Sequence, residues 1–105
     1  MLFRSISTLT SKQRAYLRGL AHHLKPILQV GHDGVSEAFI RSLEEAFRTR
    51  ELLKVKVLDS APDDARASAD AIVAGLARVE VAQTIGRTVA LYRPFEEEPE
   101  IRLPS

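Results

Sequence analysis

The segment VGHDGVSEAF, residues 30–39, combines residue types that could bind an anion. Gly31 and Gly34 flank a His-Asp pair, and Ser36 stands where a helix N-cap is expected. Glycine adopts positive φ without steric cost and lets another backbone come close. Because N–H groups at a helix start carry about half a positive charge, this loop could seat a phosphate. A strand-to-helix turn with no ligand remains the simpler explanation of the four residues taken alone.

Two features of the loop bear on the phosphate hypothesis. The loop is too short for a Walker loop and lacks the Lys-Ser/Thr ending of that motif. Asp33 places a carboxylate inside the loop, where it would repel a phosphate. The RNA-binding KH module nevertheless clamps a nucleotide backbone with a similar Gly-x-x-Gly loop.

Basic side chains recur at spacings that gather them on shared faces. Arg14 and Arg18 are four residues apart, so they lie along one side of a predicted helix, with Lys25 roughly on the same side. Lys54 and Lys56 share one face of a predicted strand. A solvated surface explains each group separately, but their combination with the double-glycine loop favours a phosphate-bearing ligand.

The charge is distributed unevenly along the chain. Its 105 residues carry a formal net charge of +1. Residues 1–58 contain ten basic and five acidic side chains, a charge of +5, whereas residues 59–105 contain five basic and nine acidic ones, a charge of −4. A basic half beside an acidic half indicates a polyanionic partner for the first half.

The sequence offers no convincing catalytic or metal-binding constellation. His22 and His23 are adjacent on a helix and point about 100° apart, so they cannot easily ligate one metal. His32 and Asp33 lack an evident third ligand, and Ser36 has no His–Asp pair to activate it. The chain has no cysteine, and no apolar run approaches the roughly 18 residues that span a bilayer. We therefore expect no enzyme, no metal, no cofactor and no membrane partner.

Periodicity and capping signals indicate the elements of the first half. A helix opens at Thr10, because Gln13 three residues on completes a capping box. It is predicted to end before Pro26, since the residue before proline avoids helical angles. Residues 27–30 form a short apolar strand, and Ser36 caps a second helix.

The second half is predicted to contain a third helix between strands. Residues 52–59 alternate apolar and polar side chains as a half-buried strand does. Residues 60–79 predict a helix with Pro62 in its first turn. Residues 79–93 indicate two strands joined by a Gly86-Arg87 turn, because a two-residue turn with glycine first favours a hairpin.

The order of elements is therefore α-β-α-β-α-β-β. Strands that alternate with helices need crossover connections, so part of the sheet should be parallel, and the terminal hairpin makes it mixed. We expect an α/β two-layer sandwich with a mixed four-stranded sheet. Residues 1–94 form the one domain, and residues 95–105, rich in glutamate and proline, form an acidic tail expected to be flexible or lightly docked.

Several blocks of the sequence together resemble one known family. They are GLAHHLKPILQVGHDGVSEAF, RELLKVKV and IGRTVALYRP, in family order and at family spacing from about Leu9 to Pro94. The chain resembles the CRM domain (chloroplast RNA splicing and ribosome maturation), and within it the YhbY-like single-domain bacterial proteins. Several such blocks are far more specific than a lone Gly-x-x-Gly.

The resemblance implies a non-catalytic RNA-binding protein. It implies a sandwich similar to the C-terminal domain of translation initiation factor three. It also implies association with precursor rRNA of the large ribosomal subunit, in the pre-50S particle, and a role in ribosome assembly. We expect a cytoplasmic protein that is monomeric. The alternative is a protein-interaction module that docks on a ribosomal protein or an assembly factor without touching RNA.

The resemblance also implies which residues contact RNA. The proposed RNA-contacting loop carries over onto Gly31, His32, Asp33 and Gly34. The family's basic surface carries over onto a set spread over the rest of the chain: Arg14, Arg18, Lys25, Lys54, Lys56 and Arg87.

Overall fold

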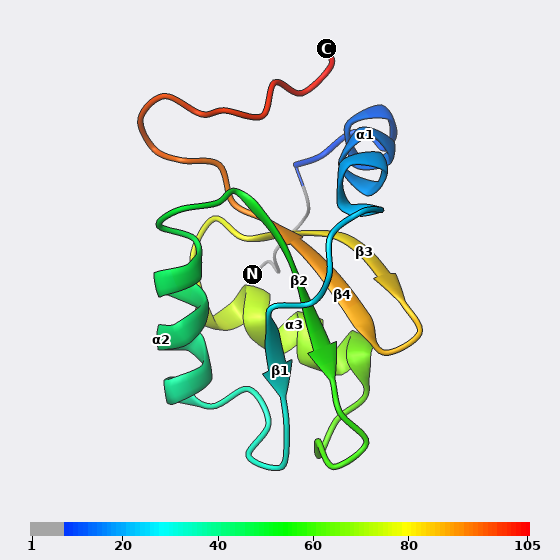
Figure 1. Cartoon of the computed structure of the whole chain (residues 1–105), viewed down its shortest axis with the longest axis vertical. Coiled ribbons are helices and arrows are strands. Elements are labelled where there is room, and N and C mark those ends of the chain that lie inside the picture. Colours follow the sequence, from blue (N-terminus) through cyan, green and yellow to red (C-terminus); the bar gives the residue numbers. More distant parts are fainter. Residues whose placement is uncertain (1–7) are drawn as a thin grey trace, which may run out of the picture.

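The computed structural model describes residues 8–105 and has the predicted order of elements. Three helices and four strands form a small α/β domain (Figure 1). The predicted α/β class with a mixed four-stranded sheet is confirmed, but the expected two layers are wrong, because helices lie on both faces of the sheet. The elements are α1 (Ser11–Ala21), β1 (Leu28–Val30), α2 (Glu37–Ala46), β2 (Leu52–Val57), α3 (Ala65–Gly75), β3 (Glu80–Ile85) and β4 (Thr88–Tyr92).

The sheet is mixed, with the strand order β1-β2-β4-β3. β1 pairs with β2 in parallel, and Val30 lies opposite Val57. β4 runs antiparallel to both β2 and β3. The carboxyl ends of β1 and β2 therefore lie at one end of the sheet, measured along the strands, and the carboxyl end of β4 lies at the opposite end.

The two faces of the sheet are covered differently. On one face, α2 and α3 bury the larger core, in which Leu43 and Ile72 pack against β2 side chains such as Val55. On the other face, α1 packs Leu17 and Ala21 over one end of the sheet. Because side chains alternate along a strand, the lysines of β2 lie on the face of α1. Figure 1 shows α1 near the end at which β2 begins.

Side-chain caps explain where two of the helices begin. At α1 the Thr10 side chain accepts from the N–H of Gln13 at 3.0 Å, and the Gln13 side chain accepts from the N–H of Thr10 at 3.1 Å. This is the predicted capping box. At α3 the Asp64 side chain accepts from the N–H of Ala67 at 2.8 Å, so the helix begins at Ala65. Pro62 lies in the preceding loop, and its predicted place in the first turn was wrong.

α1 ends earlier than Pro26 predicted. Its last residue is Ala21, and the N–H of His22 bonds to the carbonyl oxygen of Gly19 at 3.3 Å. This tightened turn follows a glycine, the weakest helix former after proline. Lys25 therefore lies in the connector between α1 and β1, and the interpretation that placed it on one helix side with Arg14 was wrong.

Residues 95–105 are seated against the domain. The N–H groups of Phe95, Glu100 and Ile101 all donate to the buried carboxylate of Glu51, at 2.7 to 3.0 Å. The tail then passes α1, where the Gln13 side chain donates to the carbonyl oxygen of Pro104 at 3.0 Å. These hydrogen bonds dock residues 95–105 on the domain in a defined conformation. The expected flexibility of the tail stays a prediction.

Within residues 8–105, no helix is long and apolar enough to cross a membrane. The same part of the chain holds no group of three or more His, Cys, Asp or Glu side chains that could bind a metal ion.

Candidate nucleic-acid interface

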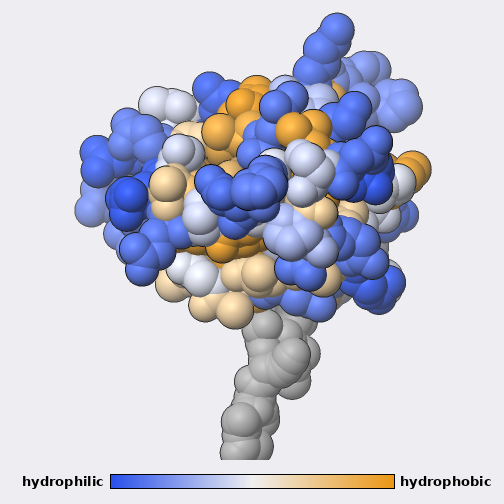
Figure 2. Space-filling model, turned by 90° about the horizontal axis from the view of Figure 1, so that it is seen from below, coloured by the Kyte–Doolittle hydropathy of each residue, from blue (hydrophilic) through white to orange (hydrophobic). Residues whose placement is uncertain are grey.

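The Gly31–Gly34 loop leaves the carboxyl end of β1 as a tight turn. The N–H of Gly34 donates to the carbonyl oxygen of Gly31 at 2.9 Å, and the N–H of Ser36 donates to that of Gly34 at 3.0 Å. The loop lies beside the β2–α3 loop, at the lower end of the molecule in Figure 1. Figure 2 shows this end, where hydrophilic residues form most of the surface and apolar areas are small.

The two glycines of the loop differ in what the fold requires of them. Gly34 has φ = 68°, and an added Cβ would meet Pro62 Cγ at 3.0 Å. Turn geometry and close packing therefore both require glycine there. Gly31 lies outside the left-handed region, and its Cβ would come only within ordinary contact of Leu58, at 3.7 Å. The turn explains Gly34 but gives no reason for Gly31.

His32 and Asp33 form the exposed tip of the loop. Nδ1 of His32 and Oδ1 of Asp33 are 3.1 Å apart, and the two side chains are 90% and 86% exposed. The Asp33 carboxylate bonds to His32 and not to the backbone of the turn.

The start of α2 adjoins this tip. Ser36 Oγ accepts from the N–H of Phe39 at 3.1 Å, as predicted for an N-cap. Glu37 follows in the first turn, where its carboxylate already complements the positive end of the helix dipole. The helix start therefore offers an incoming phosphate less attraction than its backbone alone would.

Lys54 and Lys56 lie side by side on the face of the sheet that α1 leaves open. Lys54 is opposite Ala90, and Lys56 lies between Gln29 of β1 and Thr88 of β4. Neither lysine has an ion-pair partner within residues 8–105. Gln29 comes two residues before Gly31, so Lys56 lies near the edge of the sheet from which the loop departs.

Arg18 and Lys25 add two exposed cations on the same side of the sheet. Arg18 lies on α1, and Lys25 lies in the connector that enters β1. The connector joins the sheet beside Lys54, because the N–H of Ile27 donates to the carbonyl oxygen of Lys54 at 3.0 Å. We call this set the basic face: Arg18, Lys25, Lys54 and Lys56.

The remaining two predicted arginines are held by backbone carbonyls. Arg14 donates from Nη1 to the carbonyl oxygen of Val81, at a β-bulge in β3 between Val81 and Gln83. Arg87 donates to the carbonyl oxygens of Val57 and Leu58, at 2.8 and 2.7 Å. The structure gives these two guanidinium groups a role in joining elements and does not place them on the basic face.

Sequence reasoning missed Glu51, the acidic residue that the structure buries. It precedes β2 and lies within the RELLKVKV block, but nothing in that block indicates that its carboxylate is buried. Its carboxylate lies near Tyr92, and burial together with this negative charge raises the pKa of the Tyr92 phenol above its usual value of 10.0. Only the folded chain shows why a charged side chain belongs at this position.

The chain is similar in sequence to known proteins over most of its length. The family model of the CRS1 / YhbY (CRM) domain matches residues 9–93. The chain is 46% identical over 96 residues to the "Probable RNA-binding protein YqeI" of Bacillus subtilis, covering 91% of this chain and 99% of that protein. It is 40% identical over 99 residues to a Haemophilus influenzae protein named "RNA-binding protein", covering 94% and 98% respectively.

A solved structure shows the same arrangement of elements. The solution structure of the hypothetical protein SAV1595 from Staphylococcus aureus superposes with a TM-score of 0.77 at 40% identity, over 92% of this chain and 100% of that one. Sequence blocks, family model and fold therefore agree over nearly the whole length. The chain belongs to the CRS1/YhbY (CRM) domain family.

Proposed function

We propose that this protein binds RNA through the basic face and the Gly31–Gly34 loop. The ligand is precursor rRNA of the large ribosomal subunit, and the protein acts in the cytoplasm as a non-catalytic, monomeric factor in assembly of that subunit. The names of the relatives support RNA as the ligand. The ribosomal role comes from the family resemblance.

The observation that carries the proposal is the separation of charge between the two faces of the sheet. The chain has no acidic residue before Asp33, so α1 and its connector present only cations beside Lys54 and Lys56. α2 and α3, on the other face, carry several acids. α2 and α3 also carry Arg41 and Arg66, so we expect a polyanion to prefer the face of α1 without being excluded from the opposite one.

The proposed mechanism is the positioning of the RNA backbone. Lys54 and Lys56 are two residues apart on a strand, about 6.7 Å along its axis, so they can contact different phosphates. Gly31, whose hydrogen atom leaves room beside the turn, would let a third phosphate approach the backbone at the edge of the sheet. Such contacts fix register without reading bases, and selectivity would come from RNA shape.

Sedimentation and crosslinking test the proposal together. In cell extract at low salt the protein should co-sediment with precursors of the large subunit, and it should leave them at high salt. Sequencing of RNA crosslinked to the protein should return large-subunit rRNA. If the protein stays in free protein fractions while a known rRNA binder sediments with the particles, the assembly role is wrong.

One observation favours the alternative of a protein partner. Tyr16, Leu20 and Leu24 are exposed at helical spacing along α1 and its end, and exposed Ile27 follows. A ribosomal protein or assembly factor could dock on this apolar stripe. Its complex would resist salt, whereas RNA binding should weaken by roughly 0.7 to 0.9 log units per log unit of salt for each phosphate contact.

A further inference from the structure

A hollow of about 380 Å³ opens far from the basic face. It lies between the C-terminal end of α2, the segment joining α3 to β3, and the chain that leaves β4. Arg93 follows Tyr92, so its side chain alternates onto the face of α2 and α3. β4 also ends at the edge of the sheet opposite the Gly31–Gly34 loop. The hollow therefore lies on the other face of the sheet from the proposed RNA-binding surface, and at the other end of the strands.

Three arginines line this hollow: Arg48, Arg78 and Arg93. Nε of Arg93 is buried and has no hydrogen-bond partner within residues 8–105. The backbone N–H of Arg93 donates to the carbonyl oxygen of Glu51 at 2.8 Å. A buried donor without an acceptor costs stability, and the same guanidinium carries further N–H groups that could donate to a ligand in the hollow.

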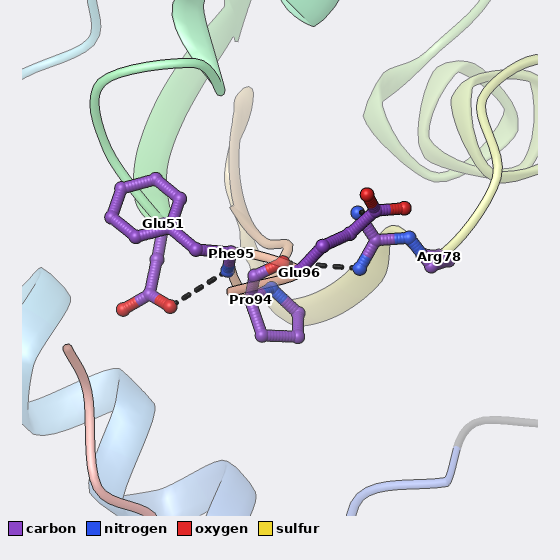
Figure 3. Close-up of polar contacts among 5 residues, drawn as sticks. All are labelled: Glu51, Arg78, Pro94, Phe95 and Glu96. Carbon is purple, nitrogen blue, oxygen red and sulfur yellow. Dashed lines mark hydrogen bonds and ion pairs between the residues drawn. The ribbon is translucent and has the colours of Figure 1, made fainter. Parts of the chain in front are cut away.

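Arg78 is fixed at the rim of the hollow. Its Nη1 donates to the carbonyl oxygen of Pro94 at 3.1 Å, and its Nη2 lies 3.7 Å from Oε2 of Glu96 (Figure 3). A guanidinium has five donors, so these two contacts leave others for a ligand. Arg48 is more exposed, and its Nε pairs with Glu45 at 3.3 Å. The site therefore has one half-buried arginine, one fixed by the chain that leaves β4, and one that is exposed.

The rest of the lining selects the kind of ligand. Glu44 and Glu96 also line the hollow, and their carboxylates would oppose a bare anion while accepting hydrogen bonds from N–H groups. Phe47 and Phe95 supply apolar wall. Figure 3 shows Phe95 and Arg78 on opposite sides of Pro94. A ligand that satisfies all of these groups is anionic at one end, and at the other end is planar, apolar on its faces and rich in N–H donors.

We propose that this hollow binds a nucleoside phosphate. The phosphate would contact Arg78 and Arg93, as guanidinium groups bind phosphate oxygens. The base would lie against Phe95 with its amino edge toward a carboxylate. Pockets that enclose small ligands begin at about 300 Å³, so the volume suits one nucleotide. The proposal does not depend on RNA binding at the basic face, and either can hold without the other.

Titration of the full chain with each of the four nucleoside monophosphates, followed by backbone amide NMR, tests the proposal. We expect saturable shifts at Arg78, Arg93 and Phe95, and roughly tenfold weaker binding of inorganic phosphate. Arg93→Gln should weaken nucleotide binding about tenfold, because a charged hydrogen-bond partner is lost. A trinucleotide with a 5′-phosphate, compared with its 5′-hydroxyl form, shows whether the nucleotide can belong to an RNA end or must be free.

Two further variants separate binding from folding. Arg48→Gln removes the positive charge of an arginine that lines the hollow, so it should weaken binding. Because this side chain is exposed, the melting temperature should stay unchanged. Arg66→Gln, on the exposed surface of α3 and outside the hollow, is the matched control and should leave affinity unchanged. The proposal is overturned if no saturable shift occurs at millimolar nucleotide, or if the shifts gather at Lys54 and Lys56. Equal affinity for inorganic phosphate and nucleotide would likewise overturn it.

Discussion

Glu51 and Ile101 lie 50 positions apart in the chain, and the N–H of Ile101 donates to Oε1 of Glu51 at 2.7 Å. The same carboxylate accepts from Glu100 at 3.0 Å and, through Oε2, from Phe95 at 2.8 Å. One side chain at the start of β2 thus satisfies three backbone donors of the tail. A carboxylate is the appropriate acceptor, because it has two oxygens and no donor of its own.

Replacing Glu51 should destabilise the fold. Glu51→Ala leaves three partly buried N–H groups without their acceptor, and we expect a loss of about 2–4 kcal/mol of unfolding free energy. Glu51→Gln keeps one acceptor oxygen but turns a donor toward the tail, so its loss should be smaller. Urea denaturation measures both. Glu45→Gln, on the exposed surface of α2, should stay within about 0.5 kcal/mol of the wild type, and a similarly small effect of Glu51→Ala would show that the tail adds nothing.

Removing both lysines of the basic face should weaken RNA binding without unfolding the protein. Lys54 and Lys56 extend from β2 away from the larger core, so the double change to alanine should barely alter the melting temperature. The slope of log affinity against log salt should become shallower by the contribution of two phosphate contacts, roughly 1.4 to 1.8. The matched control is Arg41→Ala with Arg66→Ala, on the opposite face. If the control pair reduces the slope as much as the lysine pair does, the basic face is not the binding surface.

The two glycines of the loop should respond differently to alanine. Gly34→Ala forces a side chain into positive φ and against Pro62, so it should cost about 1–2 kcal/mol of stability. Gly31→Ala meets only ordinary contact with Leu58 and should be nearly neutral for folding. If a phosphate approaches the loop, Gly31→Ala should still lower RNA affinity several-fold in a titration. If folded Gly31→Ala binds RNA with unchanged affinity, the loop serves only as a turn and does not contact RNA.

Asp33 probes the same loop through charge. Its carboxylate is highly exposed and contacts His32, so Asp33→Asn should leave the melting temperature unchanged. If the loop binds phosphate, the variant should tighten RNA binding a few-fold and Asp33→Lys more strongly, because a repulsion across several Å is removed or reversed. Binding measured at two salt concentrations should show a larger gain at the lower one. If the Asp33 variants bind RNA no more tightly than the wild type at either salt concentration, the loop is not part of the RNA interface.

Tyr92 should make the fold sensitive to alkaline pH. Its folded pKa is raised above 10.0 by burial and then by the negative charge of Glu51. Above pH 10 the unfolded chain therefore releases the phenol proton while the folded chain retains it, and unfolding free energy falls as pH rises through the folded pKa. Urea denaturation between pH 8 and pH 11 should show a steeper fall for the wild type than for Tyr92→Phe. Tyr16→Phe, which changes an exposed tyrosine, should follow the wild type.

Local patterns predicted the elements well, because local interactions decide them. The capping box at Thr10, the cap at Ser36 and the Gly86-Arg87 hairpin all follow from residues close in sequence. Alternation along β2 likewise separated its lysines from its buried valines. The family resemblance supplied the RNA-contacting role of the Gly31–Gly34 loop, and that role stays a prediction.

Tertiary contacts account for what the sequence did not predict. Spacing shows which side of α1 is apolar, but not that α1 covers the opposite face of the sheet from α2 and α3. The burial of Glu51 depends on donors that lie far along the chain. Arg14 and Arg87 likewise donate to carbonyl oxygens of residues distant in sequence. The hollow beside Arg93 is assembled from three separate segments, so no single motif in the sequence indicates it.

The β-bulge in β3 has a consequence for how the protein behaves at high concentration. β3 is an edge strand, and an exposed edge invites pairing with a strand of another molecule. The bulge between Val81 and Gln83 interrupts the regular ladder, and Arg14 already occupies the carbonyl oxygen of Val81. At the other edge, β1 is only three residues long. Both margins of the sheet are therefore poor templates for aggregation, which suits a protein whose sheet presents an open, basic face to its surroundings.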